Sequence, residues 1–140
     1  MDDNQLLAQL SNVDMNIELM LKVAGLSDIA TSWIMFIYVS PEQDWTSLDK
    51  VLAYLHLELM NQFDIDEELA KRIARIAVEE NILNQVFSQR IRSAIVGCNQ
   101  STFSRKAAWY QGMVSTVKNL IAAWEKEAVD KIKYYHKDAG

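Results

Sequence analysis

The longest apolar pattern in the chain restricts its fold more than any other feature. Apolar residues alternate at spacings of four and three from Phe103 to Ala128, over more than three heptads. This spacing places their side chains on one face of an α-helix. We therefore expect a helix from about Ser101 to residue 136. Its apolar face comprises Phe103, Ala107, Tyr110, Val114, Val117, Ile121, Trp124 and Ala128.

Shorter segments show the same periodicity. Helices are expected over about residues 4–24, 29–39, 47–63 and 65–80, and, after a break or bend near Asn81, over 82–97. Ser27 is expected to cap the second of these, and Gly25 and Gly97 to end helices. In the last of them the helical period is resumed by Ile82, Leu83, Val86, Phe87, Ile91 and Ile95.

The scarcity of turn-forming residues supports an all-helical fold. One Pro and four Gly among 140 residues leave little material for hairpins, and half of the residues are hydrophobic, which suffices for a core. The predicted fold class is all-α. We expect a single domain over residues 1–140, a bundle of about five to six helices with a long C-terminal helix.

The charges are divided unequally between the two halves of the chain. Residues 1–70 contain thirteen Asp/Glu and two Lys, whereas residues 71–140 contain twelve Lys/Arg and six Asp/Glu. The net charge of -5 therefore conceals an acidic half and a basic half. The basic half is expected to meet an anionic partner, while the acidic half shields it, meets a cationic partner or pairs with it in the fold.

Other features point to a cytoplasmic protein without catalytic chemistry. Cys98 has no second cysteine with which to form a disulfide, and the chain opens with acidic residues instead of a basic signal sequence. The apolar run Ile29–Val39 is too short to span a membrane. His56 and His136 have no metal-binding or catalytic partner at a suitable spacing. We therefore expect no catalytic residue, no metal site and no cofactor.

One stretch of the basic half carries a recognisable pattern. A helix is expected to end at Gly97, and a second one starts with hydroxyl side chains and a basic pair. Residues 90–110 resemble the helix-turn-helix of small phage-type repressors and activators, in which a small residue precedes the turn Gly by four positions. Apolar residues flank that Gly, and another lies six positions beyond it. The matching residues are Ser93, Val96, Cys98 and Phe103.

The resemblance implies a transcription regulator that binds double-stranded DNA through a helix-turn-helix within residues 83–112. The residues that it places against DNA are Gln100, Ser101, Thr102, Ser104, Arg105 and Lys106, with Arg90 and Arg92 near the backbone. Two positions depart from the family pattern. Arg92 and Lys106 stand where the family usually buries apolar side chains.

A regulator of this kind is expected to be a homodimer, because one short helix buries little surface on DNA. The expected dimer contact is the apolar stripe at the end of the long helix, formed by Trp124, Ala128, Ile132 and Tyr135. In the alternative, this stripe packs on the N-terminal helices of the same chain.

The acidic half supports an alternative function. A protein-binding inhibitor, immunity-type protein or adaptor could occupy a basic site on a partner protein through its acidic N-terminal surface. The residues expected on that surface are Asp2, Asp3, Asp14, Glu18, Asp28 and Trp45. Trp45 is included because an exposed aromatic side chain can anchor a protein partner.

Overall fold

The computed structural model describes the backbone of residues 3–12, 16–39 and 45–139. It describes the side chains of these residues except Asn4, Ser11, Asn12, Trp45 and 134–139. All regular structure in these ranges is helical, which confirms the all-α prediction. No helix in these ranges is both long enough and apolar enough to cross a membrane.

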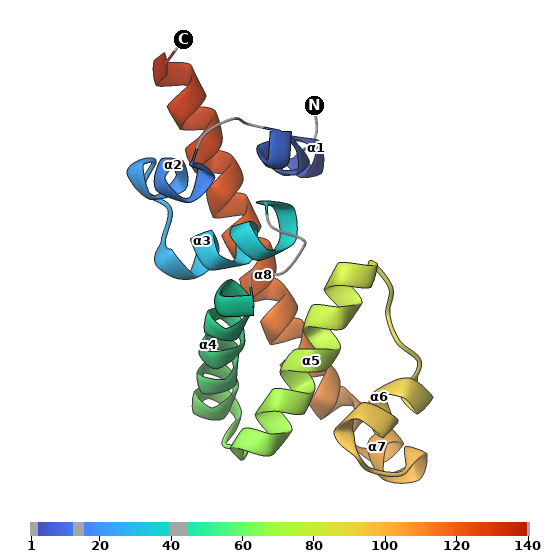
Figure 1. The fold of residues 1–140 in the computed structure, drawn as a ribbon. Coiled ribbons are helices and arrows are strands. Elements are labelled where there is room, and N and C mark those ends of the chain that lie inside the picture. The colour runs from blue at the N-terminus through green and yellow to red at the C-terminus, as the bar shows by residue number, and fades with distance from the viewer. Residues whose placement is uncertain (1–2, 13–15, 40–44, 140) are drawn as a thin grey trace. The chain divides into compact units, whose positions relative to one another are not determined.

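Eight α-helices occur in the described residues, so the expected five to six is too low (Figure 1). They are α1 (Asp3–Ala8), α2 (Ile17–Val23), α3 (Asp28–Ile34), α4 (Trp45–Phe63), α5 (Glu67–Leu83), α6 (Gln89–Val96), α7 (Gln100–Arg105) and α8 (Ala107–Ala139). A 3-10 turn, Gln9–Asn12, follows α1, and a π-helical turn, Met35–Val39, continues α3. The expected long C-terminal helix is present as α8, which has 33 residues.

Three predicted helices are interrupted in the structure. The helix expected over 4–24 is divided, and Asn16 starts α2 by accepting the Leu19 N–H at 3.1 Å. The helix expected from Ser101 is divided at Lys106, whose φ and ψ of -112° and 16° are not helical. The helix expected over 82–97 is also wrong, because α5 continues to Leu83 and α6 begins only at Gln89.

The chain forms two compact units. The first unit consists of residues 1–51 and 121–140, and the second unit consists of residues 52–120. Helices α4 and α8 contribute residues to both units. The two units are described separately below.

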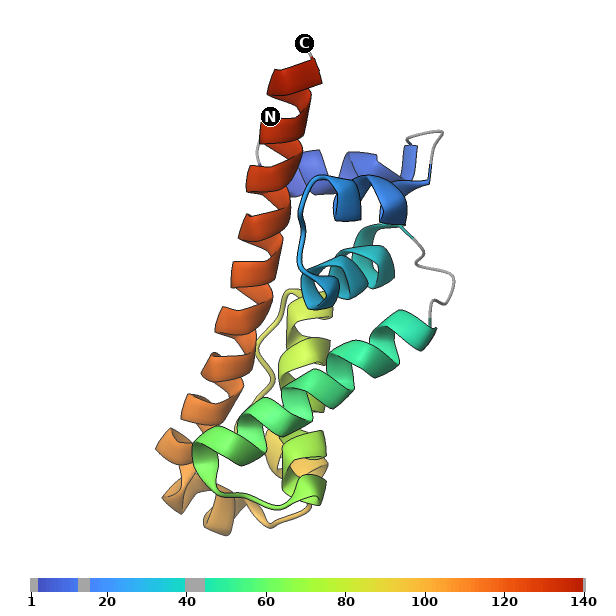
Figure 2. The same ribbon diagram turned by 90° about the vertical axis from the view of Figure 1, so that its left-hand side faces the viewer.

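The first unit is built around Trp33. Figures 1 and 2 show α2 and α3 beside the C-terminal part of α8. The Trp33 side chain is completely buried, and its ring centroid lies 6.3 Å from that of Trp124 on α8. The Trp33 Nε1–H and the Tyr38 hydroxyl both donate to Glu125, at 3.4 and 2.6 Å. Burial, together with the hydrogen bond and the charge of Glu125, raises the pKa of Tyr38 above its usual range.

A carboxylate from α8 also holds the start of α3. The backbone N–H and the hydroxyl of Ser27 donate to Glu127, at 2.9 and 3.1 Å. Ser27 occupies the N-cap position, but its hydroxyl does not cap the helix as expected. The negative charge of Glu127 instead lies at the end of α3 where the helix dipole is positive.

The second unit contains α5, α6, α7, most of α4 and the beginning of α8. Its core combines apolar side chains from four of these helices. They are Leu55, Leu59, Ala70, Ile73, Ala74, Ile76, Ala77, Val78, Phe103, Tyr110, Met113, Val114 and Val117. This core supports α6 and α7, which carry the residues of the helix-turn-helix pattern.

We predict that Trp33→Ala lowers the free energy of unfolding by about 3–5 kcal/mol, because it leaves a cavity in the core of the first unit. Urea denaturation followed by far-UV circular dichroism measures the loss. Trp109→Ala is the control, because the Trp109 side chain is 39% exposed, and it should lower the free energy by clearly less than Trp33→Ala does. Equal losses in the two variants would contradict this description of the core.

Candidate nucleic-acid interface

Helices α6 and α7 are joined by three residues, Gly97–Asn99. Gly97 has a φ of +89°, a left-handed conformation that favours glycine, and its N–H bonds the Ser93 carbonyl at 2.8 Å. Asn99 then caps α7 by accepting the Thr102 N–H at 2.7 Å. Two short helices thus follow each other around a glycine turn. We call residues 89–106 the α6–α7 segment.

An arginine from α5 holds the turn in place. The Nη1 atom of Arg72 donates to the carbonyl oxygens of Ile95 and Val96, each at 3.2 Å. Carbonyls in the last turn of a helix have no hydrogen-bond donor within that helix. Arg72 supplies the donor for two such carbonyls of α6. A Cβ atom on Gly97 would lie 2.6 Å from the same Nη1 atom. The backbone conformation therefore favours glycine, and any larger residue would also displace the end of the Arg72 side chain.

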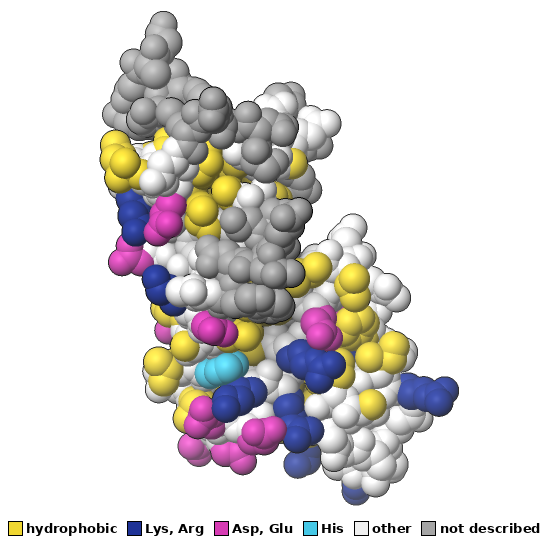
Figure 3. Space-filling model, in the orientation of Figure 1, with side chains coloured by type: hydrophobic (Ala, Val, Ile, Leu, Met, Phe, Trp, Pro, Cys, Tyr) yellow, Lys and Arg dark blue, Asp and Glu magenta, His cyan; other side chains and the backbone are white. Residues whose placement is uncertain are grey.

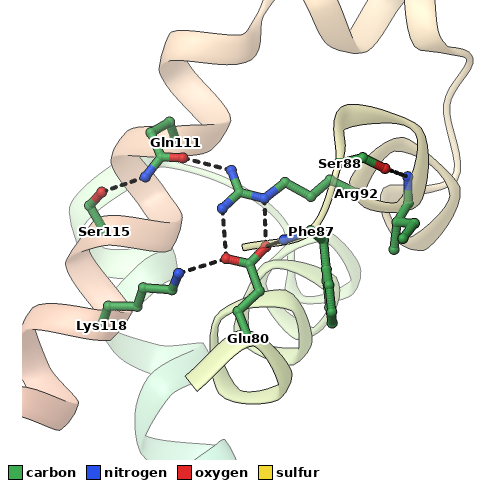
Figure 4. A network of polar contacts seen from close by, with 8 residues as sticks. Glu80, Phe87, Ser88, Arg92, Gln111, Ser115 and Lys118 are labelled. Atoms are coloured by element: carbon green, nitrogen blue, oxygen red, sulfur yellow. Dashed lines mark hydrogen bonds and ion pairs between the residues drawn. The ribbon is translucent and has the colours of Figure 1, made fainter. Parts of the chain in front are cut away.

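A buried carboxylate on α5 contacts polar groups from other elements of the second unit (Figure 4). Glu80 on α5 is only 1% exposed. Its two oxygens accept from Nε and Nη2 of Arg92 on α6, each at 2.7 Å. Lys118 on α8 donates to Glu80 at 2.6 Å, and the Phe87 N–H donates at 3.0 Å. One side chain thus connects α5, α6, α8 and the loop that precedes α6.

The network continues beyond the ion pairs. Nη1 of Arg92 donates to Gln111 Oε1 at 2.6 Å, and the Gln111 amide donates to Ser115 at 2.8 Å (Figure 4). No buried side-chain nitrogen or oxygen in the described residues lacks a partner. A fully satisfied network of this kind fixes the direction of α6 relative to α5 and α8.

The environment of Glu80 favours its ionised form. Burial alone would raise the pKa of Glu80. The hydrogen bonds from Arg92, Lys118 and the Phe87 N–H, and the charge of Arg92, outweigh burial and lower the pKa below its ordinary value.

The structure corrects the role expected for Arg92. Its side chain was expected near the DNA backbone, but the residue is 6% exposed and its guanidinium is occupied by Glu80 and Gln111. The helix-turn-helix pattern usually buries an apolar side chain at this position. Arg92 is buried there too, with its charge neutralised by Glu80. The missed signal was Glu80, the last acidic residue before a long acid-free segment.

The other residues expected to face DNA form a polar outer side of the segment. Thr102 is half-buried, and the rest are exposed: Arg90, Gln100, Ser101, Ser104, Arg105 and Lys106. Phe103, between them, is 2% exposed and stacks on Tyr110 with ring centroids 4.6 Å apart. Phe103 therefore anchors α7 to α8 and leaves the polar side chains free to meet a partner.

Lys106 departs from the family pattern in a different way from Arg92. Its side chain is exposed, and its ammonium group lies 5.8 Å from the ring centroid of Trp109. This distance permits a cation–π interaction. The Arg105 guanidinium donates to the Thr102 hydroxyl at 3.4 Å. Both positive charges stay at the surface.

The α6–α7 segment itself carries only positive charges, although Asp66 and Glu68 line a pocket beside its residues Val96 and Gly97. The sequence contains no Asp or Glu between Glu80 and Glu125. Two of the cations in this interval, Arg92 and Lys118, bind Glu80. No carboxylate in the described residues forms an ion pair with the other three, which are Arg90, Arg105 and Lys106. Lys71, Arg72 and Arg75 on α5, in contrast, each pair with a glutamate on the same helix.

The stripe expected to form a dimer contact lies inside the first unit. Trp124 is 5%, Ala128 0% and Ile132 2% exposed, so these side chains are unavailable to a second copy. The contact of Trp124 with Trp33 shows that the stripe packs within the chain, as in the alternative interpretation. The Tyr135 side chain lies outside the described residues.

The acidic surface expected to bind a protein is partly neutralised within the chain. Asp3 pairs with Lys133 at 3.3 Å, and Glu18 pairs with Lys22 at 3.0 Å. Asp28 is exposed in the first turn of α3. The remaining expected members, Asp2, Asp14 and the side chain of Trp45, lie outside the described residues.

Comparison of the chain with models of protein families, with curated proteins and with solved structures gave no match.

We predict that Glu80→Ala lowers the free energy of unfolding by about 3–5 kcal/mol, because it leaves the charge of Arg92 buried without its counterion. Chemical denaturation measures this loss. Glu79→Ala is the matched control. It removes the neighbouring glutamate, whose ion pair with Arg75 is exposed, and should change the free energy by less than about 0.5 kcal/mol. Similar losses in both variants would contradict a special role for Glu80.

Stability should also depend on the ionisation of Glu80. Because the folded state lowers its pKa, the stabilisation is fully present above the unfolded value, near 4.5, and is lost as the pH falls through the lower folded value. Denaturation of the wild type and of Glu80→Gln from neutral pH to pH ~2 tests this. The difference in unfolding free energy should shrink in the acid range. A constant difference over that range would contradict the lowered pKa.

Proposed function

We propose that the chain is a non-enzymatic, cytoplasmic transcription regulator that binds double-stranded DNA through the α6–α7 segment. The observation that carries the proposal is the set of three exposed cations, Arg90, Arg105 and Lys106, in an interval without acidic residues. Cations that no carboxylate neutralises give a surface a positive potential. Such a surface attracts the phosphates of nucleic acid.

The side chains on α7 divide into two chemical kinds. Arg105, Lys106 and, on α6, Arg90 suit phosphate oxygens. Gln100, Ser101 and Ser104 are polar, exposed and uncharged, and such groups hydrogen-bond to base edges in the major groove. In helix-turn-helix proteins the first residues of the second helix make these contacts, and α7 presents Gln100 and Ser101 there.

The buried network supports this function indirectly. Arg92 binds Glu80 and acts as a positioning residue for α6, while Arg72 secures the turn. A DNA-reading helix must be held firmly, because base contacts require placement within a fraction of an ångström. The proposed contact set therefore omits Arg92 and retains Arg90, Gln100, Ser101, Thr102, Ser104, Arg105 and Lys106.

We predict that the double variant Arg105→Ala, Lys106→Ala binds duplex DNA at least about tenfold more weakly than the wild type, because it loses two phosphate contacts. Fluorescence anisotropy of a labelled duplex over a salt series measures this. For three phosphate contacts per protein copy, the slope of log K against log salt should be about -2.7, and it should fall to about -0.9 in the variant.

The control is Lys71→Ala, Arg75→Ala, which removes the same amount of charge from exposed side chains of α5 that already pair with glutamates. Its DNA affinity should stay within about twofold of the wild type. Equal losses in the two double variants would show a response to net charge alone and contradict a specific interface. Absence of DNA binding at low salt would overturn the proposed function.

A further inference from the structure

Four large aliphatic side chains are exposed between the end of α5 and the first turn of α6. Ile82 and Leu83 at the end of α5 are 50% and 60% exposed. Val86 in the following loop and Ile91 on α6 are 69% and 45% exposed. Figure 3 shows hydrophobic side chains gathered on the second unit where α5 ends and α6 lies. We call these four residues the aliphatic patch.

The patch exists because the chain leaves the helical path at Asn84. In one continuous helix, Ile82 and Ile91 would lie on opposite faces, because they are nine positions apart. Asn84 instead adopts a left-handed conformation, with φ 51° and ψ 46°, and ends α5. Residues 84–88 then form a loop, and the apolar side chains on both sides of it face solvent.

Hydrogen bonds hold this loop at both ends. The Gln85 N–H donates to the Glu80 carbonyl at 3.1 Å, and the Phe87 N–H donates to the Glu80 carboxylate at 3.0 Å. Ser88 caps α6 by accepting the Ile91 N–H at 3.3 Å. The patch is therefore arranged before a partner arrives, and binding orders few additional groups.

The chemistry of the patch suits a second copy of the same chain. No residue from 81 to 89 carries a charge, and the first charged residue after Glu80 is Arg90. Two copies related by a two-fold axis would place aliphatic side chains on aliphatic side chains, without like charges at the centre. A charged partner surface would find no opposite charge among these residues.

The size of the patch indicates a weak dimer. Its four side chains expose on the order of 400 Å², comparable with the largest apolar patch of an ordinary monomer. Two copies together would bury on the order of 800 Å² from the patches alone, which is below the range of stable specific interfaces and within that of weak, transient ones. Such a dimer dissociates at low concentration and is reinforced when both copies bind one DNA molecule.

We propose that Ile82, Leu83, Val86 and Ile91 form a homodimer contact between two copies of this chain. The contact replaces the buried stripe at Trp124 as the dimer surface. Its biological purpose rests on the proposed DNA binding, because pairing next to α6 sets the separation of the two α7 helices and hence the spacing of two half-sites.

Sedimentation equilibrium of the free protein tests the contact without DNA. Over ~10–500 µM, which brackets a dissociation constant of about 100 µM, the mean mass of the wild type should rise from near 16.0 kDa towards twice that value. The double variant Leu83→Gln, Val86→Gln should raise the dimer dissociation constant at least about tenfold. Its thermal unfolding should match that of the wild type, because both side chains are largely exposed.

The control double variant is Leu57→Gln, Val23→Gln, whose exposures of 61% and 69% match the 60% and 69% of Leu83 and Val86. It should leave the dissociation constant unchanged. A wild type that stays at the monomer mass over the whole range overturns the proposal and leaves the patch to a different partner. Equal effects of the two double variants, or no effect of the patch variant, also overturn it.

Measurements with DNA separate this proposal from the proposed function. Arg105→Ala, Lys106→Ala should lose DNA binding and keep the dimer. Leu83→Gln, Val86→Gln should bind a duplex with one half-site as the wild type does, and lose only the extra affinity for a duplex with two. Dimerisation without DNA binding would refute the function alone, and DNA binding by a strict monomer would refute the dimer contact alone.

Discussion

The buried carboxylate of Glu80 is the constraint on which the second unit depends. A charge removed from water is stable only if opposite charges and hydrogen bonds replace the lost solvation. Arg92 and Lys118 supply the charges, and the Phe87 N–H supplies a further hydrogen bond. Because these partners come from α6, α8 and the loop between α5 and α6, satisfying one carboxylate fixes all three elements. The network thus determines which residues of α6 reach the surface.

Two left-handed residues divide the chain where that surface is made. Asn84 ends α5 and Gly97 ends α6, with φ of 51° and 89°. The first break exposes the aliphatic patch, and the second turns the chain into α7. Both breaks are held from α5, through Glu80 in one case and Arg72 in the other. The proposed dimer contact and the proposed DNA surface therefore both depend on side chains of α5.

The opposite charges of the two halves of the chain are only partly paired with each other. In the first unit, Asp3 from the acidic half pairs with Lys133 from the basic half. Two acids of α8, Glu125 and Glu127, accept hydrogen bonds from neutral groups of the N-terminal helices. In the part of the chain that the structure describes, Glu80 is the carboxylate that forms ion pairs with cations of the acid-free interval that follows it. The remaining positive charge of this interval is what an anionic partner would meet.

The sequence by itself determined the properties that depend on near neighbours. The helical period, the end of α6 at Gly97, the presence of a long C-terminal helix and the burial of Phe103 could be predicted because each follows from residues within a few positions. Only the tertiary structure decided that Arg92 and Lys118 bind the Glu80 carboxylate. Arg92 is 12 positions from Glu80 in the sequence, and Lys118 is 38 positions from it. The tertiary structure also buried the stripe at Trp124 and exposed Val86. Periodicity shows that a side chain has an apolar face to cover, but what covers it depends on which distant segment the fold brings to that face.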